Sequence, residues 1–517
     1  MRPCAVKRIQ DVHCFCVRRA TQRTGGTLTC AAACLSAAFF LWLTVPACAA
    51  KTAEASHGKP FGSPLTAAPA DPAISRALTD VSASHIRQTI STLVDFRTRN
   101  TLSSMDTDLP PGTGVTAAAS WIEQQFTAIS DACHGCLEVK TDTFTEPGDP
   151  GPRSRIKVPT TITNVYAILR GSDPAQASRM YLVTGHYDSR RTDVMDSHGI
   201  APGANDDGSG TAVSIECARV LSRHRWPATI VFVAVAGEEQ GLNGSSHLAK
   251  LAKEQGWQLG GALNNDIVGG DTTPGDTLQD KTRLRVFSQG IPATATPDEV
   301  KRTLALGLES DGHSRELARV VTSVGRTYFR AGTFRPVLEF RLDRYLRGGD
   351  HFSFNQQGFA AVRFTEWREN FDHQHQDVRV ENGKEYGDLL KFVDFNYVAN
   401  VARLNAATLA TLASAPAAPE QVRIVTSNLD NNSTLRWKPG PGMPAAAHFD
   451  ILWRDTSAPD WQFHQPVPAA DAANGAENGA EPDSMTLPVS KDNVIFGVRA
   501  CNTAGQCSPA VAPLPER

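Results

Sequence analysis

The segment Thr229-Ile-Val-Phe-Val-Ala-Val-Ala-Gly-Glu-Glu239 decides the fold predicted for this chain. Its first part is a continuous apolar run, which predicts a strand buried on both faces of a sheet. Glu238 and Glu239 follow directly, and two adjacent carboxylates repel each other unless a cation or a proton intervenes. We therefore expect a metal site where this strand ends.

Strand-like and helix-like segments alternate on both sides of this run. A second apolar run, Met180-Tyr-Leu-Val-Thr184, predicts another buried strand. Alternation of this kind favours an α/β fold with parallel strands. We predict a mixed, mostly parallel sheet flanked by helices, in a domain over residues 74–413. The expected helices are 84–96, 117–129, 210–224, 245–255 and 394–412, and the other expected strands are 164–169, 262–267, 337–342 and 361–364.

The last hundred residues have a different character. A Pro/Ala hinge at 414–419 leads into short alternating segments at 435–437, 449–453 and 494–499. Alternation over short strands is typical of an all-β sandwich. Residues 414–517 are therefore predicted to form a second domain, which resembles a fibronectin type III domain with Trp437 in the core-tryptophan position.

Length and composition are consistent with this division. A chain of 517 residues exceeds one ordinary core. The net charge is -3, so no basic excess exists to neutralise phosphates, and we expect no nucleic-acid partner.

The N-terminal region has the order of an export signal. Arg18, Arg19 and Arg23 precede an apolar run at 28–45, and small residues at 47–49 form a cleavage site. We expect a signal peptide over 1–49, a linker or propeptide over 50–73, a periplasmic or extracellular location, and no stable membrane partner after cleavage. An uncleaved membrane anchor and a lipoprotein modified at Cys48 are the alternatives.

Cysteine usage fits an exported protein. Six of the eleven cysteines lie in the leader. Cys133 with Cys136 and Cys501 with Cys507 are expected to close small disulfide loops, whereas Cys217 lies on an apolar helical face and is expected in the core.

Polar residues follow several other predicted strands. Taken singly, each has an ordinary structural explanation, such as a helix N-cap for Asp206 or Asp207. Ligands at the carboxyl ends of parallel strands nevertheless converge on one edge of a sheet. Zinc accepts imidazole and carboxylate ligands together, and one carboxylate can bridge two ions. The motifs are Gly185-His-Tyr-Asp-Ser189, Pro202-Gly-Ala-Asn-Asp-Asp-Gly-Ser-Gly210, Ala236-Gly-Glu-Glu-Gln-Gly241, Asn265-Asp-Ile267 and His373-Gln-His375.

Together, in this order, these motifs resemble the leucyl-aminopeptidase-type family of two-zinc exopeptidases, which includes aminopeptidase S. The resemblance covers about 74–412 and implies the zinc exopeptidase fold with two Zn²⁺ per chain. It implies that Asp206 bridges the ions, with His186 and Asp266 completing one site and Glu239 and a late histidine the other. It also implies that the Asp206–Asp207 peptide bond is cis.

The same resemblance implies the catalytic residues. Glu238 is expected to act as the general base, and Asp188 to orient His186 from behind.

Two candidates exist for the late histidine. Counting from Glu369-Asn-Phe371 favours His375, and counting backwards from Asp377 favours His373. We take His375 as the expected ligand and keep His373 as its alternative.

The predicted function is a secreted zinc-dependent aminopeptidase that hydrolyses N-terminal residues from peptides or proteins. A glutaminyl cyclase with one zinc and a carboxypeptidase are alternatives on the same scaffold, although no clear arginine cluster for a terminal carboxylate is visible. A catalytically inactive, receptor-like binding protein is the alternative from another class.

Overall fold

A computed structural model describes residues 61–469 and 483–517. The predicted signal peptide and its cleavage site lie outside these residues. Over the described ranges, the structure contains no helix whose length and apolar character would let it span a bilayer.

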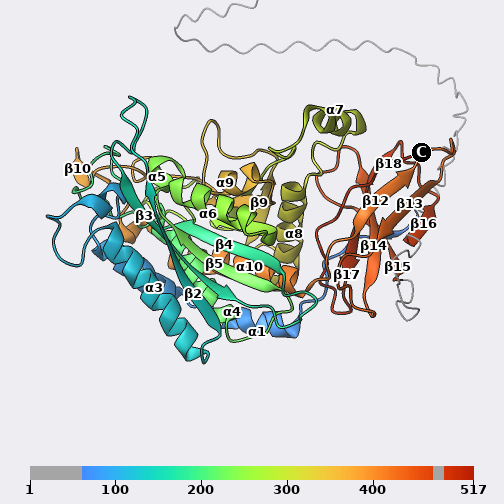
Figure 1. Ribbon diagram of the computed structural model, residues 1–517, viewed down its shortest axis with the longest axis horizontal. Helices are drawn as coiled ribbons and strands as arrows, with labels where there is room; N and C mark the ends of the chain where they lie inside the picture. Colours follow the sequence, from blue (N-terminus) through green and yellow to red (C-terminus); the bar gives the residue numbers. More distant parts are fainter. Residues whose placement is uncertain (1–60, 470–482) are drawn as a thin grey trace, which may run out of the picture. The chain divides into compact units, whose positions relative to one another are not determined.

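A twisted eight-stranded sheet forms the centre of the larger domain (Figure 1). Its middle strands run parallel, from β5 through β4 and β6 to β9, whereas β2, β3 and β7 have antiparallel neighbours. The sheet is thus mixed, with parallel strands where the motifs lie. Its strands in spatial order are β2 (Leu137–Glu146), β3 (Thr160–Leu169), β5 (Thr229–Val235), β4 (Arg179–His186), β6 (Gln258–Asn265), β9 (Ala361–Glu366), β7 (Arg283–Ser288) and β8 (Arg335–Glu339).

Helices cover both faces of this sheet (Figure 1). Every residue of β5 is buried, as the apolar run predicted. One face packs against α1, α2, α3, α4, α8 and α10, and the other against α6 and α9. The helices are α1 (Pro72–Thr79), α2 (Ala83–Asp95), α3 (Val115–Ala132), α4 (Gly208–Leu221), α5 (Glu238–Gly241), α6 (Asn243–Glu254), α7 (Pro297–Leu306), α8 (His313–Tyr328), α9 (His351–Gln356) and α10 (Phe395–Ser414), with 3₁₀ turns η1 (Thr101–Met105) and η2 (Leu390–Phe392) and a small hairpin of β10 (Arg379–Glu381) and β11 (Lys384–Tyr386).

Two further four-stranded sheets have the orders β1-β15-β14-β17 and β16-β13-β12-β18, and all their strands except β1 follow α10. They share one core around Trp437 and Phe449, which forms because inward-facing side chains of both sheets meet there. The likeness of this part to fibronectin type III remains a prediction. Its strands are β1 (Ser63–Pro64), β12 (Glu420–Val425), β13 (Ser433–Lys438), β14 (His448–Asp455), β15 (Phe463–Pro468), β16 (Asp483–Leu487), β17 (Val494–Cys501) and β18 (Leu514–Glu516).

The short strand β1 comes from the segment predicted as a linker or propeptide. Ser63 pairs with His464 of β15, so this segment adds a strand to the C-terminal sheets. A buried ion pair also joins these sheets to the larger domain, because Arg454 donates to both Asp311 carboxylate oxygens at 2.9 and 2.8 Å.

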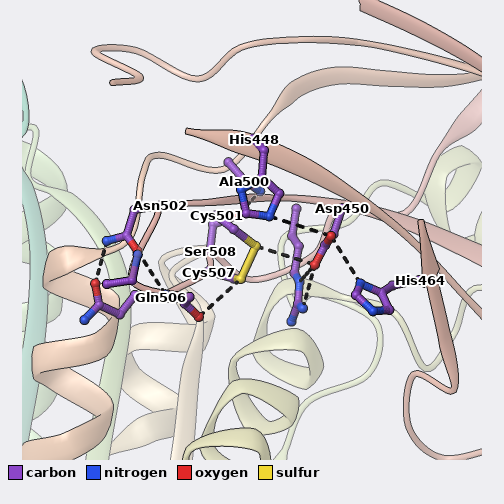
Figure 2. Close-up of a disulfide and its surroundings, with 12 residues drawn as sticks. His448, Asp450, His464, Ala500, Cys501, Asn502, Gln506, Cys507 and Ser508 are labelled. Atoms are coloured by element: carbon purple, nitrogen blue, oxygen red, sulfur yellow. Dashed lines mark hydrogen bonds and ion pairs between the residues drawn. A yellow bond between two sulfur atoms is a disulfide. The ribbon is translucent and has the colours of Figure 1, made fainter. Parts of the chain in front are cut away.

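Both expected disulfides are present, Cys133–Cys136 and Cys501–Cys507, and Cys217 is a buried free thiol. Around the second disulfide, Figure 2 shows the Asp450 carboxylate between His464 and the Cys501 sulfur. Arg499 donates to the same carboxylate at 2.8 Å.

Candidate metal centre

Three neighbouring parallel strands deliver the predicted ligands to one edge of the sheet. His186 is the last residue of β4, and Asp266 directly follows β6. Glu238 and Glu239 open α5, just after the end of β5. Because β5, β4 and β6 are adjacent and parallel, their carboxyl ends bring these side chains together.

Six of the predicted residues form two groups of ligand atoms. The first group is His186, Glu238 and Asp266, the second is Asp206, Glu239 and His375, and within each group the ligand atoms lie within 4.8 Å of one another. Each group thus holds one imidazole and two carboxylates, a set that suits zinc.

Asp206 connects the two groups. Its Oδ1 lies 3.2 Å from His186 Nε2, and its Oδ2 lies 2.9 Å from His375 Nε2. The two oxygens of one carboxylate therefore face the two groups separately, which is the geometry that a bridging ligand needs.

The two late histidines occupy different surroundings. His375 Nε2 lies 3.2 Å from Glu239 Oε1, inside the second group. His373 instead places Nδ1 3.0 Å from Asp271 Oδ1 and stacks on Phe392 at 3.7 Å between ring centroids. Of the pair, His375 is the one that the structure brings to the other candidate ligands.

The unpaired atoms of the site fit a bound cation. His186 Nε2 and Glu239 Oε1 are buried and make no well-oriented hydrogen bond, although each lies 3.2 Å from a polar atom, Asp206 Oδ1 and His375 Nε2 respectively. A buried polar atom without a partner costs free energy, and coordination to a metal removes that cost. A histidine nitrogen and a carboxylate oxygen are both ordinary zinc ligands, so the residues present fit zinc.

Asp188 lies behind the site and fixes two parts of it. His186 Nδ1 is 3.1 Å from the Asp188 backbone oxygen and 3.4 Å from its Oδ1. The Asp188 carboxylate also accepts hydrogen bonds from the backbone N–H groups of Glu238 and Glu239, at 3.3 and 3.1 Å. Asp188 therefore contacts both the imidazole of His186 and the start of α5.

The loop before α4 positions Asp206. The Asp206–Asp207 peptide bond is cis, as the resemblance implied. Asp207 caps α4 by accepting from the Gly210 N–H at 2.8 Å, and it also accepts from the His186 N–H. The buried Arg99 holds the same loop by donating to the backbone oxygens of Pro202 and Gly203.

The electrostatics of the site reflect a concentration of negative charge. Loss of hydration raises the pKa of Glu238 well above its usual range, and Glu239 and Asp266 raise it further against the opposing effect of His186. Burial would lower the pKa of His375, but Glu239 and Asp206 outweigh it and raise that pKa to about 10. Excess negative charge of this kind attracts cations.

Three further residues support the site and were not predicted. Arg363 Nη1 lies 2.6 Å from Asp266 Oδ2. Gln374 donates to Asp206 Oδ2 at 3.0 Å, and the Asp388 carboxylate accepts from the Asp206 N–H at 2.7 Å. Arg363 interrupts the otherwise apolar run 359–364, and Gln374 lies between the two candidate histidines, so both had a visible signal, whereas no local pattern marks Asp388.

The chain matches known proteins over this site. The model of peptidase family M28 matches residues 164–385, a range that contains all six grouped residues. A "Probable zinc metalloprotease" of Pyrenophora teres f. teres (strain 0-1) is 42% identical over 457 residues, covering 88% of this chain and 89% of that protein. The chain belongs to peptidase family M28. It is therefore a zinc metalloprotease, a hydrolase whose substrates are peptides.

Two other known proteins are also similar to this M28 peptidase. A "Probable zinc metalloprotease" of Pyricularia oryzae (strain 70-15) is 42% identical over 463 residues, covering 88% of this chain and 87% of that protein. The crystal structure of the Legionella pneumophila LapA aminopeptidase is 20% identical with a TM-score of 0.43, over 66% of this chain and 74% of that one.

Proposed function

We propose that this M28 peptidase is an exported two-zinc aminopeptidase. The observation that carries the proposal is the position of Asp206, whose Oδ1 faces His186 and whose Oδ2 faces His375. Asp206 would bridge two ions, of which His186 and Asp266 hold one and Glu239 and His375 the other.

Two zinc ions at this site would polarise the scissile carbonyl and make water a nucleophile at neutral pH. Glu238 is the general base of the proposal. Its carboxylate belongs to the same group as His186 and Asp266, and its backbone N–H is held by Asp188. From there Glu238 takes the proton of the attacking water and passes it to the leaving amine, a role that needs a pKa shifted towards neutrality.

The preference for a free N-terminus is supported by the resemblance of the five motifs to the leucyl-aminopeptidase type. In this proposal the free α-amino group of the substrate would be received at the metal centre by the ion that does not polarise the scissile carbonyl. A blocked N-terminus would lose that contact.

Export is supported by the order of arginines, apolar run and small residues before residue 50. The two disulfides in the described residues also suit an oxidising compartment. The C-terminal sheets, proposed as a fibronectin type III-like domain, complete the secreted protein without a catalytic role.

Metal analysis combined with a substrate panel tests the proposal. The purified full chain should contain two zinc ions, lose activity to a chelator and regain it with Zn²⁺. It should cleave aminoacyl nitroanilides and peptides with a free N-terminus, and fail on the same peptides with an acetylated N-terminus.

Other outcomes of the same panel would replace the proposal. One zinc with cyclisation of N-terminal glutamine would make the chain a glutaminyl cyclase. Cleavage of N-acetylated peptides from the C-terminus would make it a carboxypeptidase, and zinc without any turnover would favour a binding protein.

A further inference from the structure

An exposed group of side chains borders the candidate metal centre and has no role in the chemistry described above. We call Tyr345, Leu346, Arg347 and Phe371 the rim cluster. The exposed fractions of Tyr345, Leu346 and Phe371 are 75%, 94% and 64%. Exposed apolar side chains that gather in one place mark binding surfaces more often than isolated ones do.

The rim cluster adjoins the first metal group through its own chain. Directly after Arg347, the Gly348 oxygen accepts from Arg363 at 2.9 Å, and Arg363 binds Asp266. A Cβ at Gly349 would lie 2.3 Å from Arg363 Nη1 and 3.4 Å from Asp266 Oδ2. The backbone that follows the cluster therefore packs directly on a predicted zinc ligand.

The rim cluster also adjoins the second metal group. Phe371 lies in the loop that carries His375, and the Arg347 guanidinium lies over the Phe371 ring at 5.7 Å. The cluster thus lies where two loops meet. One is the loop before Gly349, and the other is the loop that carries His375. This surface therefore lies next to the loops that contact the two metal groups.

Positive charge is in excess at the rim. The buried Glu369 carboxylate accepts from Arg285 at 2.8 Å, from Arg344 at 2.9 Å and from Arg347 at 2.6 Å. Burial would raise the pKa of Glu369, but the surrounding arginines hold it below its usual value. Arg344 also pairs with Asp343 at 2.9 Å, so two carboxylates face these three guanidinium groups, and one positive charge in excess remains to attract anions.

Arg347 is the arginine of this set that reaches solvent most. Its side chain is 31% exposed, compared with 7% for Arg344 and 18% for Arg285. Within the described residues, Glu369 is the one hydrogen-bond partner of its side chain. A guanidinium group carries five N–H donors, so Arg347 keeps donors for a second carboxylate, in the two-point geometry that arginine favours.

We propose that the rim cluster binds the peptide beyond the scissile bond, with Arg347 pairing to a free C-terminal carboxylate and Phe371 packing on an apolar side chain. The preferred substrates are then short peptides with an apolar residue after the first. This inference rests on the proposed aminopeptidase function and names the substrate class of that same site.

Paired substrates test the inference in the unmodified enzyme. The peptide Leu-Phe should be hydrolysed with a higher kcat/KM than Leu-Phe amide, by about tenfold or more, the scale of one charge-assisted hydrogen bond. A ratio near one would overturn the inference. Leucine nitroanilide, measured alongside, reports the aminopeptidase activity itself.

Variants test which residues produce the difference in kcat/KM between the free acid and the amide. Arg347→Gln should bring the ratio between free acid and amide close to one, and Arg347→Lys should retain part of it because the charge remains. Arg302→Gln removes an exposed arginine of α7 and is the matched control, whose ratio should equal that of the wild type. Phe371→Ala should reduce the advantage of Leu-Phe over Leu-Gly. Equal ratios in Arg347→Gln and Arg302→Gln would contradict the role of Arg347.

The two proposals fail in different ways. Absence of nitroanilide cleavage by the zinc-loaded wild type would remove the aminopeptidase function. Nitroanilide cleavage without discrimination between acid and amide would remove only the rim inference. A change of oligomeric state in Arg347→Gln, with an unchanged ratio, would show that the rim cluster binds a second copy instead.

Discussion

Arg363 lies fully buried in β9 with its guanidinium 2.6 Å from the carboxylate of Asp266. A buried cation at that distance fixes both the charge and the orientation of a carboxylate. Asp266 thereby keeps its Oδ1 turned towards His186, at 3.9 Å from Nε2. Arg363 is in this sense a positioning residue for the metal centre.

Arg363→Met should weaken zinc binding by about 10- to 100-fold, the usual effect of losing a group that orients a metal ligand. Competition with a chromogenic chelator measures this affinity, and Arg363→Lys should lie between Arg363→Met and the wild type. Because Arg363 also lies 3.6 Å from Asp343, thermal unfolding in excess zinc must show that the variant is folded. Wild-type zinc affinity in a folded Arg363→Met protein would contradict the positioning role.

Glu238→Gln should reduce kcat by roughly 10²- to 10⁴-fold, because the amide cannot accept the proton of the attacking water. The zinc content should stay at that of the wild type, since the proposed zinc ligands are all retained. Glu254→Gln, at the exposed end of α6, is the control for loss of a carboxylate elsewhere. Activity that survives in Glu238→Gln would remove Glu238 from the base role.

The two late histidines give opposite expectations for metal content. His375→Ala should lose about one zinc per chain, because the second group would keep only Asp206 and Glu239. His373→Ala should keep its metal, since His373 pairs with Asp271 instead. Elemental analysis of both variants decides the matter, and the reverse result would make His373 the ligand.

The pKa of Asp450 predicts how the stability of the folded protein depends on pH. Burial alone would raise its pKa, but the hydrogen bond from His464 and the charge of Arg499 outweigh it, and the pKa falls to about 2. A carboxyl group whose pKa is lower in the folded than in the unfolded state stabilises the fold above its unfolded pKa of about 4, and this stabilisation is lost as the pH falls through the folded pKa.

Asp450→Asn should therefore lower the free energy of unfolding at neutral pH, by an amount on the order of 2 kcal/mol. The difference between variant and wild type should shrink as the pH falls from about 4 to about 2. Denaturant titrations across this range measure it. A difference that is independent of pH would mean that Asp450 stabilises the protein without its charge.

The sequence predicted the central strands of the sheet because burial on both faces leaves an unbroken apolar run, as in β5 and β4. The outer strands β2 and β7 were not predicted. Only Leu137 of β2 is buried and its other residues are partly or fully exposed, so β2 lacks an apolar run. β7 contains Arg285, whose partner Glu369 is distant in sequence. The helix α7 was also missed, although Thr296 and Glu299 form a capping box that the sequence displays.

The six grouped residues could be predicted for a related reason, since each lies in a motif at a strand end or in a flanking loop. The residues that hold these six in place could not be predicted. Although Arg363 stands out in an apolar run, its contact with Asp266 and the contacts of Gln374 and Asp388 with Asp206 are tertiary, and no local spacing encodes them. The choice between His373 and His375 likewise depends on Asp271, about a hundred residues earlier in the chain.

Strand β1 affects the order in which the protein can be completed during synthesis. Ser63 and Pro64 leave the ribosome early, but their partner strand β15 is made only after the whole α/β domain. Domains usually fold one after another as the chain emerges. β1 therefore cannot pair with β15 until the C-terminal sheets have been synthesised, so this N-terminal segment joins its sheet only late in synthesis.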